Sequence, residues 1–419
     1  MINLGFQGLG FYSIAVLYLV FGICSLFSTG IVKKIGTKTS LVVGSLCYSF
    51  WIFSFLSPAF AIHAENKDFF LFRRGFVYFS LVFTAAFIGF GASIIWVAQG
   101  RYVSICCPPE KKGFFFSYFW IFFTSSIIVG NITSSVILQH LRESTFYVIL
   151  VCIGVTGSMT FLLLTDPPES QQQTQLQTQQ PQRTFMDDFQ DTINLLKSPR
   201  MLQVIPLMMQ TSISMVAATA NFLPMMYITL ENEPDMNDQL KFKTCLMALL
   251  PLGLGGMLGG SIFGQILDKF KHRFTLYFSI TLLLSAYTVL FVQVYLWKFN
   301  SLLYILSLIW GFQDSFQNNF VQCVCGFEFD SNLTPFSISK LTQAITTFFL
   351  LLISSTLKTQ AQFAMYFIFT MIFGLFSLIL LLNFNYRGKP QPGKQFAEQK
   401  EKLNEMSDLI KHDKKQEKV

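Results

Sequence analysis

Long apolar stretches, separated by short polar connections, run along most of the chain. A helix needs about 20 mostly apolar residues to cross the hydrocarbon of a bilayer, because each residue adds roughly 1.5 Å. The apolar runs are continuous and lack the period-two alternation of a membrane β-barrel. The pattern therefore predicts eleven transmembrane helices, at residues 10–32, 40–62, 75–98, 114–138, 145–165, 201–229, 245–267, 274–297, 302–327, 336–357 and 363–384.

The composition agrees with a membrane location. Apolar residues make up 52% of the chain and charged residues only 13%, whereas an average soluble domain carries about 25% charged residues. So few charges cannot cover the surface of a soluble globule, which excludes a soluble enzyme, a disordered hub and a nucleic-acid-binding protein. The sequence offers no nucleophile beside a plausible base, no glycine-rich phosphate cradle and no metal-ligand cluster. We therefore expect no enzymatic activity and no cofactor.

Positive charges are unevenly divided between the two sets of connections. One set, which includes the tail after residue 384, holds 21 lysines and arginines, and the other set holds 8. Connections rich in lysine and arginine usually face the cytosol. We therefore predict a multi-pass protein of the plasma membrane or an endomembrane, with a cytosolic C-terminus. Because the number of predicted spans is odd, the N-terminus would lie on the opposite side.

A low-complexity segment divides the predicted spans into five and six. Its glutamine and threonine residues, from Gln171 to Gln182, cannot bury apolar area and predict a floppy cytosolic connection. The sequence thus predicts an N-terminal five-helix bundle at 1–165, a cytosolic Gln-rich linker at 166–200, a C-terminal six-helix bundle at 201–384 and a cytosolic charged tail at 385–419.

The last part of the linker has its own helical pattern. Phe185, Phe189, Ile193 and Leu196 recur at helical spacing, opposite a set of aspartates. This spacing predicts a short amphipathic helix. Two placements stay open, one along the membrane surface and one as a solvated linker helix.

A turn between the seventh and eighth predicted spans carries a recognisable motif. Gly264 is followed by Asp268, Lys269 and Arg273 at the spacing Gly-x-x-x-Asp-Lys-x-x-x-Arg. This string resembles the turn Gly-x-x-x-Asp-Arg/Lys-x-Gly-Arg/Lys of the major facilitator superfamily, which links the second and third helices of each half. The resemblance implies two bundles of six helices, related by a pseudo-two-fold axis along the membrane normal.

A weaker copy of the turn, with Lys34 and Gly36, lies between the first and second predicted spans. Lys33 occupies the place of its aspartate, so we expect this half to lack the acidic clamp. If this copy joins the second and third helices of the family fold, the first helix of that fold would be absent. A genuine eleven-span product and an incomplete gene model would both account for this. The expected fold class is an all-α membrane protein of major facilitator fold with about eleven transmembrane helices.

Three short strings of glycine, aromatic and polar residues follow one another along both halves. They are Gly8-Leu9-Gly10, Trp96-Val-Ala-Gln99-Gly100 and Trp310-Gly311-Phe-Gln-Asp314-Ser315. In this order they resemble the uncoordinated-93-like (ion channel regulatory protein) family. The resemblance implies a protein that regulates or escorts an ion channel, such as a potassium channel, or a receptor. The implied partners are the lipid bilayer and a channel or receptor subunit.

An alternative function stays open, namely secondary transport of a small solute or ion by alternating access. The ninth predicted span is the most polar one, and Asp314 lies near its middle. Asp314, Asn318 and Gln322 share one helical stripe, with Gln317 beside it. Because an ionisable group in hydrocarbon is costly, we expect this stripe to face a wet cavity between the halves. The alternative is that these amides bond neighbouring helices in a dry interface.

Fewer polar residues mark the N-terminal half. Gln99 and Asn131, together with Trp96, are the candidates for a cavity lining there. In the tenth predicted span, Lys340 lies about four residues from the predicted cytosolic end. We therefore expect its side chain to extend to the cytosol rather than pair with Asp314.

Overall fold

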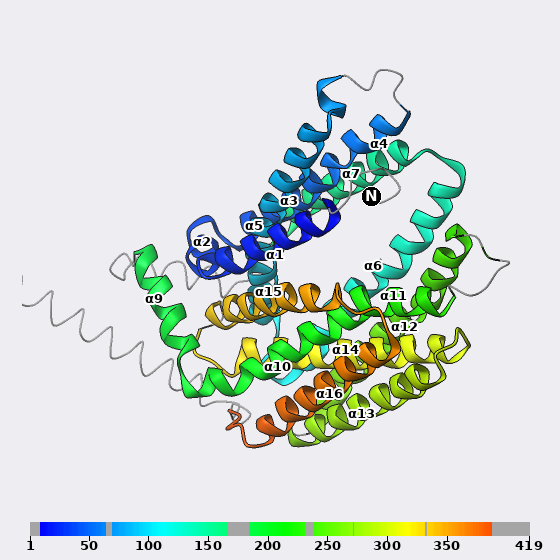
Figure 1. Cartoon of the computed structure of the whole chain (residues 1–419). Helices are drawn as coiled ribbons and strands as arrows, with labels where there is room; N and C mark the ends of the chain where they lie inside the picture. Colours follow the sequence, from blue (N-terminus) through cyan, green and yellow to red (C-terminus); the bar gives the residue numbers. More distant parts are fainter. Residues whose placement is uncertain are drawn as a thin grey trace, which may run out of the picture.

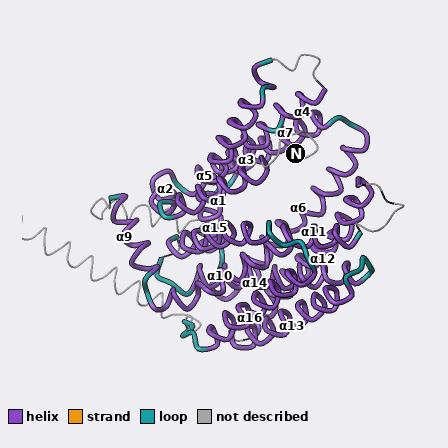
Figure 2. Tube along the Cα trace, in the orientation of Figure 1, coloured by secondary structure: helices purple, strands orange, loops and turns teal. Residues whose placement is uncertain are grey.

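The computed structural model describes residues 9–63, 69–165, 184–230, 236, 238–270, 272–331 and 333–387. Regular structure in these ranges is entirely helical (Figure 2), which confirms the all-α fold class. Among the described residues, nine helices are long and apolar enough to cross a membrane, or ten if the bent pair at the start is one span. The helix at Leu302–Phe327 falls outside that count, because its amides make it less apolar, yet it forms as predicted.

We call the helices before the linker the N-terminal half and those after it the C-terminal half (Figure 1). The N-terminal half contains α1 (Leu9–Ser25), α2 (Ser28–Ile35), α3 (Thr37–Ser54), α4 (Leu56–His63), α5 (Arg74–Cys106), α6 (Lys112–His140) and α7 (Glu143–Thr160). The C-terminal half contains α10 (Pro199–Val216), a π turn (Ala217–Asn221), α11 (Phe222–Thr229), α12 (Asp238–Lys269), α13 (His272–Leu296), α14 (Leu302–Phe327), α15 (Thr334–Ser354) and α16 (Gln360–Leu382). The helix α9 (Phe185–Leu196) lies between them.

The first predicted span is broken rather than straight. Its two segments, Tyr12–Ser25 and Ser28–Ile35, meet at an angle of 71°. Hydroxyl groups support the break, since Ser28 Oγ donates to Ser25 O at 2.8 Å and lies within hydrogen-bond distance of Ser337 Oγ of α15 at 2.9 Å. Gly36 then begins the next helix at a φ of 84°, a backbone conformation that favours glycine. These polar and backbone features redirect the chain at this point.

The linker helix α9 packs on protein. The rings of Phe185 and Phe189 stack on Phe27, with centroid distances of 5.7 and 5.2 Å. Thr184 and Asp187 form a reciprocal capping box that fixes the start of the helix. The predicted amphipathic helix forms, and its apolar face covers α2 and contacts α15. Its placement along the membrane surface or in solvent stays a prediction. The glutamine tract at 166–183 and the tail after 387 lie outside the described residues.

Two helix pairs form the most extensive contacts between the halves. The helix α1 packs against α15, and α6 packs against α12. Glycines on α12 allow the second pair to approach closely. A Cβ atom added to Gly256 would lie 2.8 Å from Thr124 Cγ2, and one added to Gly264 would lie 2.9 Å from Ser117 Oγ. Small residues at such positions let two helices pack backbone to backbone.

The two halves differ in how completely they are packed. In the C-terminal half, α10 lies against α14, α15 and α16. No described helix takes the corresponding place against α5, α6 and α7, the last three helices of the N-terminal half. As a result only 6% of the residues in the apolar window of α7 are buried, against 39% for α16.

Candidate functional site

The polar face of α14 is the predicted site in the C-terminal half. Trp310 Nε1 donates to Ser214 O of α10 at 3.1 Å, and Gln313 Nε2 donates to Ser214 Oγ at 2.7 Å. Asp314 is half-buried, and its Oδ1 has no hydrogen-bond partner among the described residues. Asn318 Nδ2 donates to the Asp314 carbonyl at 2.9 Å, which places these two residues on one face.

The other predicted amides of α14 are more deeply buried. Gln317 is 1% exposed, and both of its amide atoms lack a partner among the described residues. Gln322 is also buried, and its Oε1 lacks a partner there. Buried amides are normally hydrogen-bonded. Amides without a partner therefore indicate a region that can accept water or a polar solute. This region follows the predicted stripe of α14.

Lys340 does not extend to the membrane edge as expected. Its side chain is buried, its Nζ donates to Gln343 Oε1 at 2.8 Å, and it lies 4.7 Å from the centroid of the Trp96 ring. A cation over an indole face is stabilised by the ring quadrupole, so this lysine has partners within the protein and does not need water. The expectation was wrong because Trp96 lies in the other half, 244 residues earlier in the sequence. Lys340 and Asp314, both among the described residues, form no ion pair with each other.

The N-terminal half contains a groove of about 560 Å³ that faces α3, α5, α6 and α7. We call it the N-terminal groove; Tyr48, Trp96, Gln99, Phe123 and Gly157 are among its lining residues. Trp96 Nε1 donates to Tyr48 OH at 3.2 Å, whereas both amide atoms of Gln99 lack a partner among the described residues. Of the predicted candidates in this half, Gln99 thus lines a cavity, and the side chain of Asn131 lies outside what the structure describes.

The turn motif joins the two halves on one side of the membrane, which we call the linker side because α9 lies there. Asp268 Oδ1 accepts from the backbone N–H of Gly113 at 2.9 Å, and Oδ2 accepts from that of Phe114 at 3.0 Å. The carboxylate therefore caps the N-terminus of α6, where backbone donors and the helix dipole favour negative charge. Lys269 and Arg273 are exposed.

The weaker copy of the turn obtains its carboxylate from elsewhere. Lys33 forms an ion pair with Asp188 of α9. Lys34 is exposed, and Gly36 makes the turn into α3. The acidic group that the sequence of this turn lacks is thus supplied by the linker helix.

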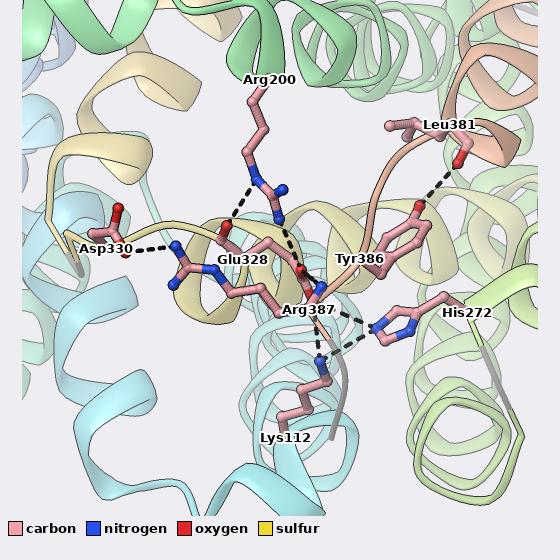
Figure 3. A network of polar contacts seen from close by, with 8 residues as sticks. All are labelled: Lys112, Arg200, His272, Glu328, Asp330, Leu381, Tyr386 and Arg387. Atoms are coloured by element: carbon pink, nitrogen blue, oxygen red, sulfur yellow. Dashed lines mark hydrogen bonds and ion pairs between the residues drawn. The ribbon is translucent and has the colours of Figure 1, made fainter. Parts of the chain in front are cut away.

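A second network on the linker side surrounds Glu328, whose side chain is 1% exposed (Figure 3). Its Oε1 lies 3.6 Å from Lys112 Nζ and 3.7 Å from His272 Nε2. Its Oε2 accepts from Arg200 Nη2 at 3.2 Å and from the backbone N–H of Arg387 at 2.6 Å. Groups from α6, α10, α13 and the segment after α16 therefore meet on one carboxylate, and Lys112 brings the N-terminal half into the network.

Aromatic rings shield this network. Tyr386 stacks on His272 with a centroid distance of 4.3 Å and donates from its hydroxyl to Leu381 O at 3.2 Å. The guanidinium of Arg200 lies 4.6 Å from the Phe384 ring centroid. Burial, and to a smaller extent the charge of Glu328, raises the pKa of Tyr386 above its usual value. The linker side is thus held closed by charged and aromatic contacts between the halves.

Residues 7–382 match the family model described as "Ion channel regulatory protein UNC-93". The chain belongs to the UNC-93 family. It is 22% identical over 412 residues to "UNC93-like protein MFSD11" of Xenopus tropicalis, covering 89% of this chain and 86% of that protein. It is also 31% identical over 98 residues to "UNC93-like protein 3" of Arabidopsis thaliana, a segment that covers 23% of this chain and 17% of that protein.

Solved structures place this UNC-93 family member in the major facilitator fold. The proton:xylose symporter XylE matches with a TM-score of 0.68 at 12% identity, covering 90% of this chain and 86% of that one. A bacterial homologue of the iron transporter ferroportin, in its outward-facing state, matches with a TM-score of 0.63 at 14% identity, with 90% of each chain covered. The predicted family and fold class are confirmed, and at these identities the structural likeness concerns the fold alone.

Sequence reasoning missed several residues that this UNC-93 family member brings together. Glu328, Lys112 and His272 lie in three separate connections, and each resembles an ordinary solvated charge in the sequence. The signal available in the sequence was that the connections on the linker side contain few acidic residues relative to their basic residues. Asp188 likewise belongs to the polar face of an amphipathic helix, and its partner Lys33 is 155 residues away.

Proposed function

We propose that this UNC-93 family member acts on another membrane protein, by regulating or escorting an ion channel, such as a potassium channel, or a receptor, and that it performs no enzymatic step. The observation that carries the proposal is the match of residues 7–382 to a single family model. The family's description as ion channel regulatory supports the same function.

Potassium current gives the test of this function. The full chain would be expressed together with a potassium channel of the same organism, and whole-cell current and the surface amount of the channel would be compared with and without it. We expect at least a twofold change in one of these quantities, in either direction. Unchanged current and surface amount, while the purified protein alone moves a solute across vesicles, would contradict the proposal.

A second candidate function is secondary transport, and the polar face of α14 specifically favours it. The unmatched atoms of Asp314, Gln317 and Gln322 lie on the helix whose Trp310 and Gln313 bond α10. In this case Asp314→Asn should abolish solute flux in reconstituted vesicles while insertion stays normal. Flux equal to that of the unmodified protein would show that the Asp314 carboxylate has no role in coupling.

A further inference from the structure

One oxygen of the buried Glu328 carboxylate faces two basic groups at almost the same distance. Oε1 lies 3.6 Å from Lys112 Nζ and 3.7 Å from His272 Nε2, and it makes no closer hydrogen bond among the described residues. Lys112 begins α6 of the N-terminal half, whereas His272 begins α13 of the C-terminal half, to which Glu328 also belongs (Figure 3). The group that lies beside Oε1 therefore decides whether this oxygen connects the two halves or contacts only its own half.

The contact between these two basic groups indicates a neutral imidazole. Lys112 Nζ lies 3.2 Å from His272 Nε2. An ammonium group has donors and no acceptor, so Nε2 accepts from it and carries no proton in this arrangement. A proton on Nε2 would bring two positive charges face to face, and a like charge at such a distance disfavours the charged form. Protonation of His272 and the present position of Lys112 therefore oppose each other.

The other groups around this carboxylate belong to the C-terminal half. Arg200 of α10 and the backbone N–H of Arg387 bind the second oxygen of Glu328 and not Oε1. Tyr386 stacks on the His272 ring, and because burial raises the pKa of its phenol, this group is neutral at and below physiological pH. The guanidinium of Arg387 pairs with an exposed aspartate. These groups hold Glu328 in its own half and do not compete with Lys112 for Oε1.

The remaining polar groups near Lys112 lie on α14 and on the turn before α13. Cys323 of α14 contributes a thiol, whose Sγ lies 3.7 Å from the backbone oxygen of Lys112. On the turn, Asp268 binds backbone N–H groups at the start of α6, and Lys269 and Arg273 are exposed, so water and salt screen their charges. The bond of Asp268 to α6 is a second contact between the halves, and it does not involve the Lys112 ammonium.

We propose that His272 is a proton-binding site that weakens the contact between the two halves on the linker side when it is protonated. The added N–H at Nε2 donates to Glu328 Oε1, and the imidazolium repels Lys112 from the carboxylate. A contact between the halves is thus replaced by one within the C-terminal half. Because the arrangement with Lys112 in place disfavours the proton and the separated one does not, proton uptake shifts the population toward separated halves. The site acts in this way whether the protein regulates a channel or transports a solute.

Distance measurements between the halves at two pH values test this site. Lys34 at the end of α2 and Asn383 directly after α16 are exposed on the linker side and lie outside the Glu328 network. We would attach spin labels at these two positions in the full chain, with its eight native cysteines replaced, and reconstitute it in nanodiscs. Double electron–electron resonance at about pH 5.5 and about pH 8 covers the range in which imidazoles usually titrate. We expect a longer inter-label distance whose share rises at least threefold at the lower pH.

Two substitutions of His272 with opposite expected results keep the test independent of general destabilisation. His272→Gln keeps a polar group that does not titrate, so the share of the longer distance should stay low at both pH values. His272→Arg carries a positive charge at both pH values, so this share should be high at both. Tyr386→Phe is the matched control, because it keeps a ring beside the imidazole, removes the phenol, and should leave the pH response unchanged.

Three results would overturn the inference. Equal distance distributions at the two pH values in the spin-labelled chain with His272 present would show that no proton acts on this contact. A pH response that persists in His272→Gln would assign the titration to another group, such as Asp268. A high share of the longer distance at both pH values in His272→Gln as well as in His272→Arg would show that the imidazole only fills space and that its charge has no role.

Discussion

The two halves of this molecule share a fold but differ in how they are completed. In the C-terminal half, α10 lies between three other helices and gives Gln313 a hydrogen-bond partner in Ser214. In the N-terminal half the N-terminal groove lies among α3, α5, α6 and α7, and the amide of Gln99 in its lining is buried and unmatched among the described residues. The comparison shows that a buried amide of this fold has a partner where a neighbouring helix presents a hydroxyl group, as α10 does for Gln313.

Glycine substitutions should give the largest difference in stability between the two halves. A Cβ atom added to Gly255 on α12 would lie 1.9 Å from the carbonyl oxygen of Leu308, which is backbone and cannot move aside. Gly255→Ala should therefore lower stability by about 3 kcal/mol, at the upper end of ordinary overpacking. The same change at Gly157 should leave stability equal or slightly higher, because it meets open space. Thermal unfolding in nanodiscs measures both, and equal losses at the two positions would remove the contrast between the halves.

A substitution in the Glu328 network should have the next largest effect on stability, because this network connects the two halves. Glu328→Gln removes the charge that Lys112 and Arg200 share, and hydrogen bonds to charged groups contribute about 2 kcal/mol. We expect a lower melting temperature and faster cysteine labelling on the linker side. Asp330→Asn is the matched control, since its carboxylate is 97% exposed and its pair with Arg387 should contribute nothing measurable. Equal effects of the two variants would show that the buried carboxylate does not hold the halves together.

A smaller effect should come from the contact of Lys340 with Trp96. A double-mutant cycle with Trp96→Leu and Lys340→Met isolates the pair, and its coupling energy should be about 1 kcal/mol for a desolvated cation over an indole ring. Melting temperatures of the four proteins give this energy. A coupling energy near zero would mean that the lysine is held by Gln343 alone and that this contact does not join the halves.

The smallest expected effect is a dependence of stability on alkaline pH. Because burial and Glu328 raise the pKa of Tyr386 in the folded protein, the neutral phenol is favoured by folding. Its contribution is complete below the unfolded pKa of about 10 and is lost as the pH rises above that value. The difference in melting temperature between the unmodified protein and Tyr386→Phe should therefore shrink between pH 9 and pH 11. A difference that stays constant over this range would show that the phenol does not titrate with unfolding.

The sequence was sufficient for the helices and for the family, because both depend on local patterns. Continuous apolar runs predicted the spans, and the turn at Gly264 and Asp268 indicated the fold. The contacts between halves could not be predicted in the same way. The aspartate was recognised, but its partners are the backbone groups at the start of α6, which no pattern near residue 268 specifies.

Errors in the predicted site have the same origin. Lys340 was assigned to the membrane edge from its distance to the end of its own helix, while its actual partner is Trp96 in the other half. The bend between α1 and α2 was missed because hydroxyl bonds to Ser337 of α15 hold it. The stripe of α14 was predicted from its own spacing and forms as a helix face, but what this face binds stays a prediction.

A cryo-electron microscopy map of the full chain, isolated in native nanodiscs from its own membranes, tests the central claim most directly. The claim is that the carboxylates of Asp268 and Glu328 hold the two halves together on the linker side. We predict that the map shows Asp268 at the N-terminus of α6 and Glu328 beside Lys112 and Arg200. A map in which both carboxylates face solvent and the halves are apart on the linker side would contradict the account.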